Sequence, residues 1–169
     1  MDMNRKQKLI SEKLSELLIR QLAHELENFN LYKTFANYYA TEGVEDLAKY
    51  FNIRANEELE HQSWIFNYLT DGDIRFEYPN IKATTVKVKN LLEPFQLTLE
   101  KEIETTNMIY EIYEAAQAEK DHMTVIWLQK PLLLEQIEEE NSSRAVLGIM
   151  EQNGDIYIKA KRILNTLEG

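Results

Sequence analysis

Residues 54–61 read RANEELEH, and in this stretch Glu58 and His61 stand three positions apart. On a helix, that spacing puts the two side chains on the same face, about one turn apart. The surrounding residues, from about Val44 to Thr70, contain neither Gly nor Pro and are rich in helix-forming types. The sequence therefore predicts a long helix with a carboxylate and an imidazole side by side.

Outward from this helix, three other long segments and one short segment have the same helix-forming composition. Short connections join the first helix to the second and the third to the fourth, so each pair is expected to be antiparallel. The connection from Asp71 to about Thr85 is long enough to return along the bundle, so the second and third helices can lie parallel. We predict an all-α fold, an antiparallel four-helix bundle with this long crossover and a short fifth helix, as one domain over residues 1–169. The remaining helices are expected from about Ile10 to Tyr39, Val86 to Lys120, His122 to Gln152 and Asp155 to Leu167.

Each long helix carries an acidic residue near the middle of its apolar stripe, when the stripe is traced in steps of three and four residues. No stripe carries Lys or Arg near its acid, and His61 is the one nitrogen base on them. A buried carboxylate without a partner is costly, so protonation, a cationic side chain or a metal ion must offset it. We favour a metal ion. The acids are Glu25, Glu58, Glu102 and, on the fourth helix, Glu135, Glu138 and Glu139.

The types of ligand indicate which metal is expected. Glu58 and His61 can hold one ion together, and a bridging carboxylate can share a second. Oxygen-rich coordination with a single imidazole suits iron or manganese better than zinc. Diiron bundles carry a Glu-x-x-His pair on each of two helices. This chain has one such pair and offers Glu135 and Glu138 where the second would stand.

The composition excludes several classes of function. Lys and Arg number 19 and Asp and Glu number 29, so the formal net charge is −10. Such a surface repels nucleic acids and anionic lipids and attracts cations. The lack of cysteine excludes disulfides, thiolate metal sites and Fe–S clusters. Because no apolar run approaches ~18 residues and no signal-peptide core is visible, we expect a cytoplasmic protein without a membrane or nucleic-acid partner.

With these residues placed, the chain resembles the bacterial non-haem ferritins over essentially its whole length. Any one of the shared motifs is weak, but their order, the helix lengths and the long crossover make the combination specific. The motifs are LAHEL at 22–26 followed by Leu31 and Tyr32, RANEELEH at 54–61, FNYLTD at 66–71, Glu102, and EQIEEE at 135–140.

The resemblance implies a role for each of these residues. Glu25, Glu58 and His61 correspond to a first iron site, and Glu58 would bridge to a second iron. The other ligands of that second iron would be Glu102 and Glu139, with Gln136 beside the centre. A third, weaker iron site is implied at Glu57, Glu135, Glu138 and Glu139.

Tyr32 lies two turns after Glu25 and matches the tyrosine that adjoins the diiron centre of the family. It could supply an electron during oxygen reduction, or it could simply fill the core. In either case its phenol needs a hydrogen-bond partner.

The resemblance implies iron storage with ferroxidase activity. Two Fe(II) ions would be oxidised by O2 or peroxide at the diiron centre, and the ferric product would be stored as mineral in a homo-oligomeric shell of twenty-four subunits. In the family, the short fifth helix packs around the four-fold axes of the shell.

Other interpretations remain open. A rubrerythrin-like peroxidase or a haem-binding bacterioferritin is disfavoured by the missing second Glu-x-x-His motif, and the lack of cysteine also weighs against the former. A DNA-protecting mini-ferritin would hold its ligands between subunits. A shell subunit with an impaired centre, or a helical interaction module, would not oxidise iron quickly.

Pro131 is a departure from the family pattern, since it falls inside the fourth helix, where the chain is also one residue longer. A proline there removes a hydrogen bond, so we predict a kink or π-bulge just before Glu135. Outside the site, we expect His24 on a subunit contact and the following side chains at the surface: His122, Glu27, Glu60 and Glu140.

Overall fold

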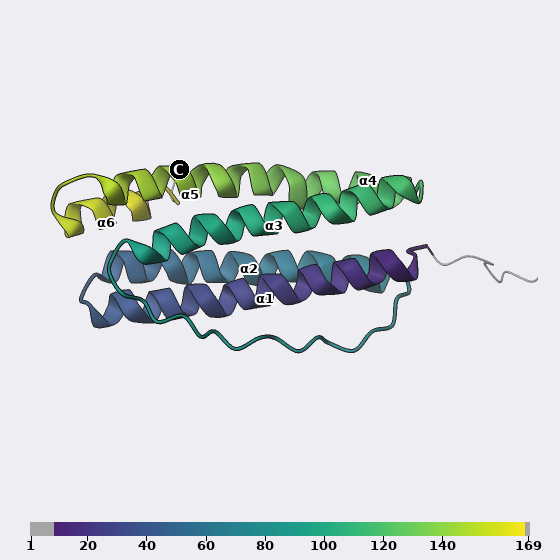
Figure 1. Ribbon diagram of the computed structural model, residues 1–169, viewed down its shortest axis with the longest axis horizontal. Helices are drawn as coiled ribbons and strands as arrows, with labels where there is room; N and C mark the ends of the chain where they lie inside the picture. Colours follow the sequence, from purple (N-terminus) through teal and green to yellow (C-terminus); the bar gives the residue numbers. More distant parts are fainter. Residues whose placement is uncertain (1–8, 168–169) are drawn as a thin grey trace, which may run out of the picture.

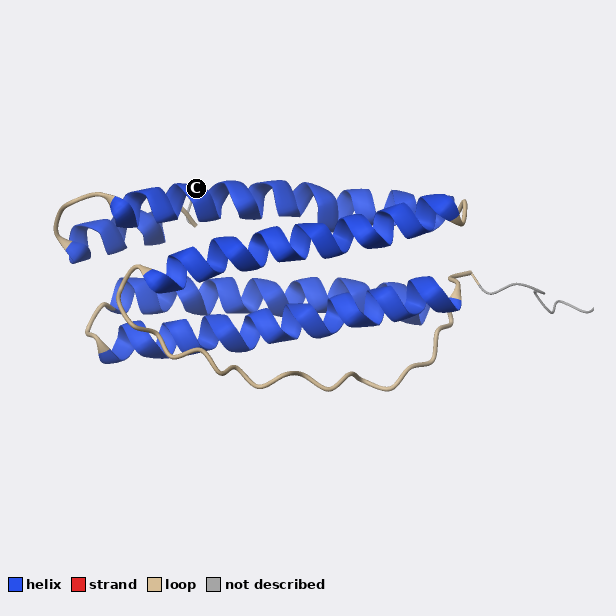
Figure 2. Cartoon of the chain, in the orientation of Figure 1, coloured by secondary structure: helices blue, strands red, loops and turns tan. Residues whose placement is uncertain are grey.

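The structure, a computed structural model, describes residues 9–167, and over that range the chain forms helices and loops without a strand (Figure 2). The predicted all-α bundle is confirmed. The single domain predicted over residues 1–169 stays a prediction, and its ends, residues 1–8 and 168–169, lie outside the described residues. The elements are α1 (Glu12–Thr41), α2 (Glu45–Asp71), α3 (Glu93–Ala118), α4 (His122–Leu128), the π-helical η1 (Gln129–Leu133), α5 (Leu134–Glu151) and α6 (Ile156–Asn165).

The four long helical rods lie side by side, and the crossover between α2 and α3 runs back along α1 (Figure 1). The backbone N–H of Lys82 in this crossover donates to Glu27 on α1 over 3.4 Å. As a result α2 and α3 run in the same direction, as predicted. None of the helices described here is long and apolar enough to cross a membrane.

Polar side chains set the starts of the helices. Ser11 accepts from the backbone N–H of Leu14 over 3.1 Å at the start of α1. Before α3, Asn90 Oδ1 accepts from the N–H groups of Leu92 and Glu93 over 2.9 and 3.0 Å. Such caps satisfy amide donors that have no partner inside the helix. Because α3 begins at Glu93, after this turn at Asn90, the predicted start of the third helix at Val86 is wrong.

The predicted fourth helix is interrupted where the distortion was expected. The π-helical segment η1 contains Pro131 and ends directly before Leu134 and Glu135. A π turn accommodates one extra residue, and it also tolerates the amide donor that proline lacks. The prediction of a kink or π-bulge before Glu135 is therefore confirmed.

The interior consists of two apolar clusters separated by a belt of buried polar side chains. The first cluster surrounds Phe35, Phe51 and Phe95 and extends to α6. The second surrounds Leu18 and Ile65 and includes residues of α4 and η1. Between them the helices turn acidic and amide side chains inward, all of them at most 5% exposed, at Glu25, Glu58, Glu102, Gln136 and Glu139. The centre of the bundle is thus polar, with apolar packing on either side to hold it in place.

Candidate metal centre

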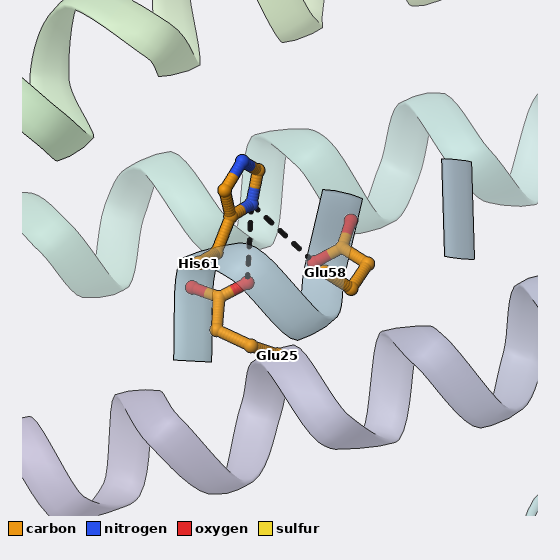
Figure 3. Close-up of side chains that lie close together, drawn as sticks. All are labelled: Glu25, Glu58 and His61. Carbon is orange, nitrogen blue, oxygen red and sulfur yellow. Dashed lines mark ion pairs between the residues drawn. The ribbon is translucent and has the colours of Figure 1, made fainter. Parts of the chain in front are cut away.

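Helices α1 and α2 bring three predicted ligands together in the polar belt. Glu25 comes from α1, and Glu58 and His61 come from successive turns of α2; their side chains point toward one another (Figure 3). His61 Nδ1 lies 3.7 Å from Glu58 Oε2 and 4.0 Å from Glu25 Oε2. These separations are too long for hydrogen bonds. They fit a shared ion, because two ligands at about 2.0–2.2 Å from one metal lie at most about 4.4 Å apart.

One oxygen of each carboxylate in this group lacks a hydrogen-bond partner. Glu25 Oε1 accepts from Gln21 Nε2 over 2.6 Å, but Glu25 Oε2 and Glu58 Oε2 are buried without a hydrogen-bond donor. Within residues 9–167, neither acid forms an ion pair with Lys or Arg. Burial, followed by the charge of Glu58, raises the pKa of Glu25 well above its usual range. Burial, followed by the charge of Glu102, raises the pKa of Glu58 in the same way. A bound cation would relieve both costs.

The second half of the belt contains a buried cation, Arg54, although the sequence predicted no Lys or Arg near the acids. Arg54 on α2 is 3% exposed, and its NH2 group lies 3.0 Å from Glu102 Oε1. Its NH1 group pairs with Glu139 Oε2 and lies 3.0 Å from Glu57 Oε2. The expectation that no Lys or Arg lies near the buried acids is therefore wrong for Glu102 and Glu139.

The signal for Arg54 was present in the sequence. Arg54 follows Phe51 by three residues and precedes Glu58 by four, so it lies on the same apolar stripe of α2. The statement that no stripe carries Lys or Arg near its acid is therefore wrong for the second helix already at the level of the sequence. A buried arginine is expected to lie against carboxylates, which would have pointed to ion pairing here.

Glu102 is fully occupied by protein donors. Its Oε1 accepts from the Tyr32 hydroxyl over 2.6 Å as well as from Arg54. Its Oε2 accepts from Gln136 Nε2 over 3.0 Å, and the same amide also donates to the Glu102 backbone carbonyl over 2.9 Å. Burial and then the Glu102 charge raise the pKa of Tyr32 well above its usual range. Tyr32 and Gln136 thus both hydrogen-bond to Glu102, and their roles at an iron site stay predictions.

Of the four residues expected around a third iron, Glu135 and Glu139 lie near His61, whereas Glu57 and Glu138 are not part of that group. Glu135 and Glu139 each offer an oxygen close to a His61 nitrogen, with all three atoms within 4.8 Å of one another. Glu57 is half-buried against Arg54, whereas Glu138 is exposed. Placing Glu138 on the core-facing row was therefore wrong. Burial raises the pKa of Glu139 to about 7, although the Arg54 charge opposes the shift.

The other singled-out residues lie outside this cluster. His24 is buried within the chain, with Nε2 2.8 Å from Thr105 Oγ1, so its burial needs no subunit contact, and burial lowers its pKa. His122 and Glu60 are exposed as expected. The expectation of full exposure was wrong for two half-buried acids, Glu27 and Glu140.

Comparison with known proteins gives a consistent family. A ferritin-like domain model matches residues 15–153. The bacterial non-haem ferritin of Staphylococcus aureus (strain USA300) is 31% identical over 159 residues, which cover 92% of this chain and 95% of that protein. The corresponding protein of Staphylococcus haemolyticus (strain JCSC1435) gives the same identity and coverage.

Solved structures agree with this result. An open-pore ferritin from the archaeon Archaeoglobus fulgidus matches with a TM-score of 0.87 and 27% identity, over 92% of this chain and 98% of that one. A humanized archaeal ferritin matches with a TM-score of 0.86 and 28% identity, over 94% and 95%. Since both the sequence and the fold match ferritins over almost the whole chain, the protein belongs to the ferritin family.

Proposed function

We propose that this protein stores iron and is a ferroxidase, which oxidises Fe(II) to Fe(III) at the centre of its own helical bundle. The observation that carries the proposal is the pair of buried, unpartnered oxygens, Glu25 Oε2 and Glu58 Oε2, facing His61 Nδ1. Membership of the ferritin family supports it independently.

The first Fe(II) ion is held by Glu25, Glu58 and His61 in this proposal. Hard carboxylate oxygens bind Fe(III) more tightly than Fe(II), so these ligands favour loss of an electron from the bound ion. The second Fe(II) is held by Glu58 together with Glu102 and Glu139, with Gln136 alongside. This site requires Arg54 to leave those two carboxylates.

The redox step balances with two iron ions. Each Fe(II) loses one electron, and the two electrons with two protons convert O2 to hydrogen peroxide, or hydrogen peroxide to two water molecules. Tyr32 can supply one of these two electrons in place of the second Fe(II), with its phenolic proton passing to Glu102 across the 2.6 Å hydrogen bond. A third, weaker iron site uses Glu135 and Glu139 beside His61, with Glu57 and Glu138 further out.

The ferric product is stored as mineral inside a cytoplasmic homo-oligomeric shell of twenty-four chains. The net charge of −10 favours iron entry, because it raises the local concentration of cations. On α6, Tyr157 and Ile158 are 60% and 65% exposed in the single chain and would be covered by subunit contacts.

Aerobic addition of Fe(II) tests the activity through near-ultraviolet absorbance. Glu58→Ala is expected to lower the initial oxidation rate at least about tenfold, because the bridging carboxylate is lost. Glu60→Ala, an exposed glutamate on the same helix, is the matched control and should oxidise iron at the wild-type rate. Equal initial rates for wild type and Glu58→Ala would remove the ferroxidase proposal.

One observation favours a second candidate function, a shell subunit with an impaired centre. Arg54 already forms ion pairs with Glu102 and Glu139 and so supplies a positive charge that an iron ion would otherwise supply there. Such a subunit would assemble and store iron without oxidising it quickly. In the assay above, it would show slow oxidation in the wild type that Glu58→Ala does not change.

A further inference from the structure

We propose that Arg54 is a resident cation of the centre, and that its guanidinium occupies the place of the second metal ion between Glu102 and Glu139. A second ion then binds only by displacing the guanidinium. This inference rests on the proposed function, since it concerns the order and strength of metal binding at the same site.

The two halves of the polar belt differ in the partners of their carboxylates. In the half formed by Glu25, Glu58 and His61, two carboxylate oxygens are buried with no donor. In the other half, both Glu102 oxygens accept hydrogen bonds from protein donors, and Glu139 Oε2 forms an ion pair with Arg54, although Glu139 Oε2 and Arg54 Nε have no hydrogen-bond partner. Among the described residues, the first half therefore has no Lys or Arg beside its acids, whereas the second half already has a cation, Arg54, between its two acids.

Arg54 and a second metal ion would compete for the carboxylates of Glu102 and Glu139. Arg54 contacts Glu102 Oε1 and Glu139 Oε2. A metal ion shared by Glu102 and Glu139 needs oxygens from those same two carboxylates. Because both cations would also repel each other strongly in a buried setting, they cannot occupy the site together. Metal and guanidinium binding are thus mutually exclusive.

Glu57 can act as the partner of the Arg54 guanidinium once a metal ion has displaced it. Glu57 lies one turn from Arg54 on α2, already 3.0 Å from its NH1 group, and its side chain is 33% exposed. By rotating toward Glu57, Arg54 can keep an ion pair while leaving Glu102 and Glu139. Displacement then costs two buried ion pairs but does not leave a buried charge without a partner.

Zinc(II) titration of the full-length, metal-free assembled protein by isothermal calorimetry tests the inference without any redox step. Wild type is expected to bind one zinc ion per chain tightly and a second at least about tenfold more weakly, because charge-assisted bonds to Arg54 must be broken first. Arg54→Gln should tighten the second ion by about tenfold or more and leave the first unchanged. Arg54→Lys, which keeps the charge, is the control and should keep the second ion weak.

Two results would overturn the inference: two equally tight zinc ions in the wild type, or an unchanged second ion in Arg54→Gln. If Arg54→Gln does not fold, the double variant Arg54→Gln/Glu57→Gln takes its place, because it removes one charge of each sign. It should bind the second zinc ion more tightly than the wild type by the same factor. Failure of the proposed function would give a different result, at the first zinc ion. The wild type would then bind no zinc ion tightly, or Glu58→Ala would bind the first zinc ion as tightly as the wild type.

Discussion

At the scale of single residues, the centre depends on carboxylates that are unstable when buried alone. Glu25 and Glu58 were predictable, because each interrupts an apolar stripe, and His61 was predictable from its spacing to Glu58. The hydrogen bond from Tyr32 to Glu102 joins α1 to α3, and no local spacing shows such a contact. Arg54 was visible on the α2 stripe, but which acids it pairs with depends on how α3 and α5 pack against α2.

Tyr32 gives a direct prediction at this scale. Freeze-quenched electron paramagnetic resonance after mixing Fe(II)-loaded protein with O2 should show a tyrosyl radical in the wild type and none in Tyr32→Phe. The substitution should also lower the free energy of unfolding by about 1–2 kcal/mol, because a hydrogen bond to a carboxylate is lost. Tyr50→Phe, another buried tyrosine, is the control and should keep the radical. A radical of unchanged intensity in Tyr32→Phe would assign it to another residue.

The pH dependence of stability also belongs to single residues. Burial raises the pKa of Glu139 to about 7, so the metal-free folded state holds a proton that the unfolded state releases above its ordinary pKa. Stability from this proton is present at acidic pH and is lost as the pH rises to about 7. Raised pKa values at Glu25 and Glu58 act in the same direction.

Chelator-treated protein should therefore lose unfolding free energy between about pH 5 and pH 7, by about 1.4 kcal/mol for each unit of pKa shift. Denaturant unfolding at several pH values measures this loss. Glu139→Gln should reduce this loss, because glutamine does not titrate and only Glu25 and Glu58 still contribute, while Glu60→Gln at the surface should leave the profile unchanged. A metal-free wild type that gains stability over this interval would contradict the assigned pKa shifts.

At the scale of elements, helix content and order followed from composition, whereas some helix ends did not. Val86 and Val88 are apolar and were placed in the third helix, but they pack against the first apolar cluster from the crossover. Asn90, whose side chain accepts from the N–H groups of Leu92 and Glu93, and Pro94 in the first turn of α3 were the signals for the true start. The π segment η1 was predictable because Pro131 and an extra residue coincide.

Deletion of Lys130 tests the role of η1. Because a π turn holds one residue more than an α turn, deleting this exposed residue should remove the π turn and leave a helix kinked at Pro131, with Gln136 and Glu139 still facing inward. The deletion should keep iron oxidation within about threefold of wild type. Deleting the exposed Ile137 should instead rotate Glu139 by about 100° relative to Gln136 and cost at least about tenfold in rate. Equal rates for both deletions would show that the register of α5 does not matter.

At the scale of the whole molecule, the single chain leaves large apolar side chains exposed on α4, α5 and α6. Ile126, Ile137 and Ile158 are 67%, 65% and 65% exposed. Isolated apolar residues at a surface are ordinary, so their exposure alone does not identify a subunit contact, and the assembly has to be measured. Local sequence patterns predict which helix faces form the core; they do not predict how copies of the chain meet.

Light scattering coupled to gel filtration measures the assembly. Twenty-four chains of 20.0 kDa should elute together near half a megadalton. Ile126→Glu should give smaller species with unchanged helical content by circular dichroism, whereas the neighbouring exposed change Lys130→Glu should leave the shell intact. A wild-type protein that elutes as a 20.0 kDa monomer would contradict the shell.

The most direct test of the central claim, that buried acids of this bundle hold transition-metal ions, is crystallographic. Crystals soaked anaerobically in Fe(II) should show an anomalous peak at the iron edge, about 2.0–2.2 Å from His61 Nδ1 and from oxygens of Glu25 and Glu58. At low iron concentration, Arg54 should still lie between Glu102 and Glu139. The absence of any peak at Glu25, Glu58 and His61 in fully soaked crystals would contradict the account.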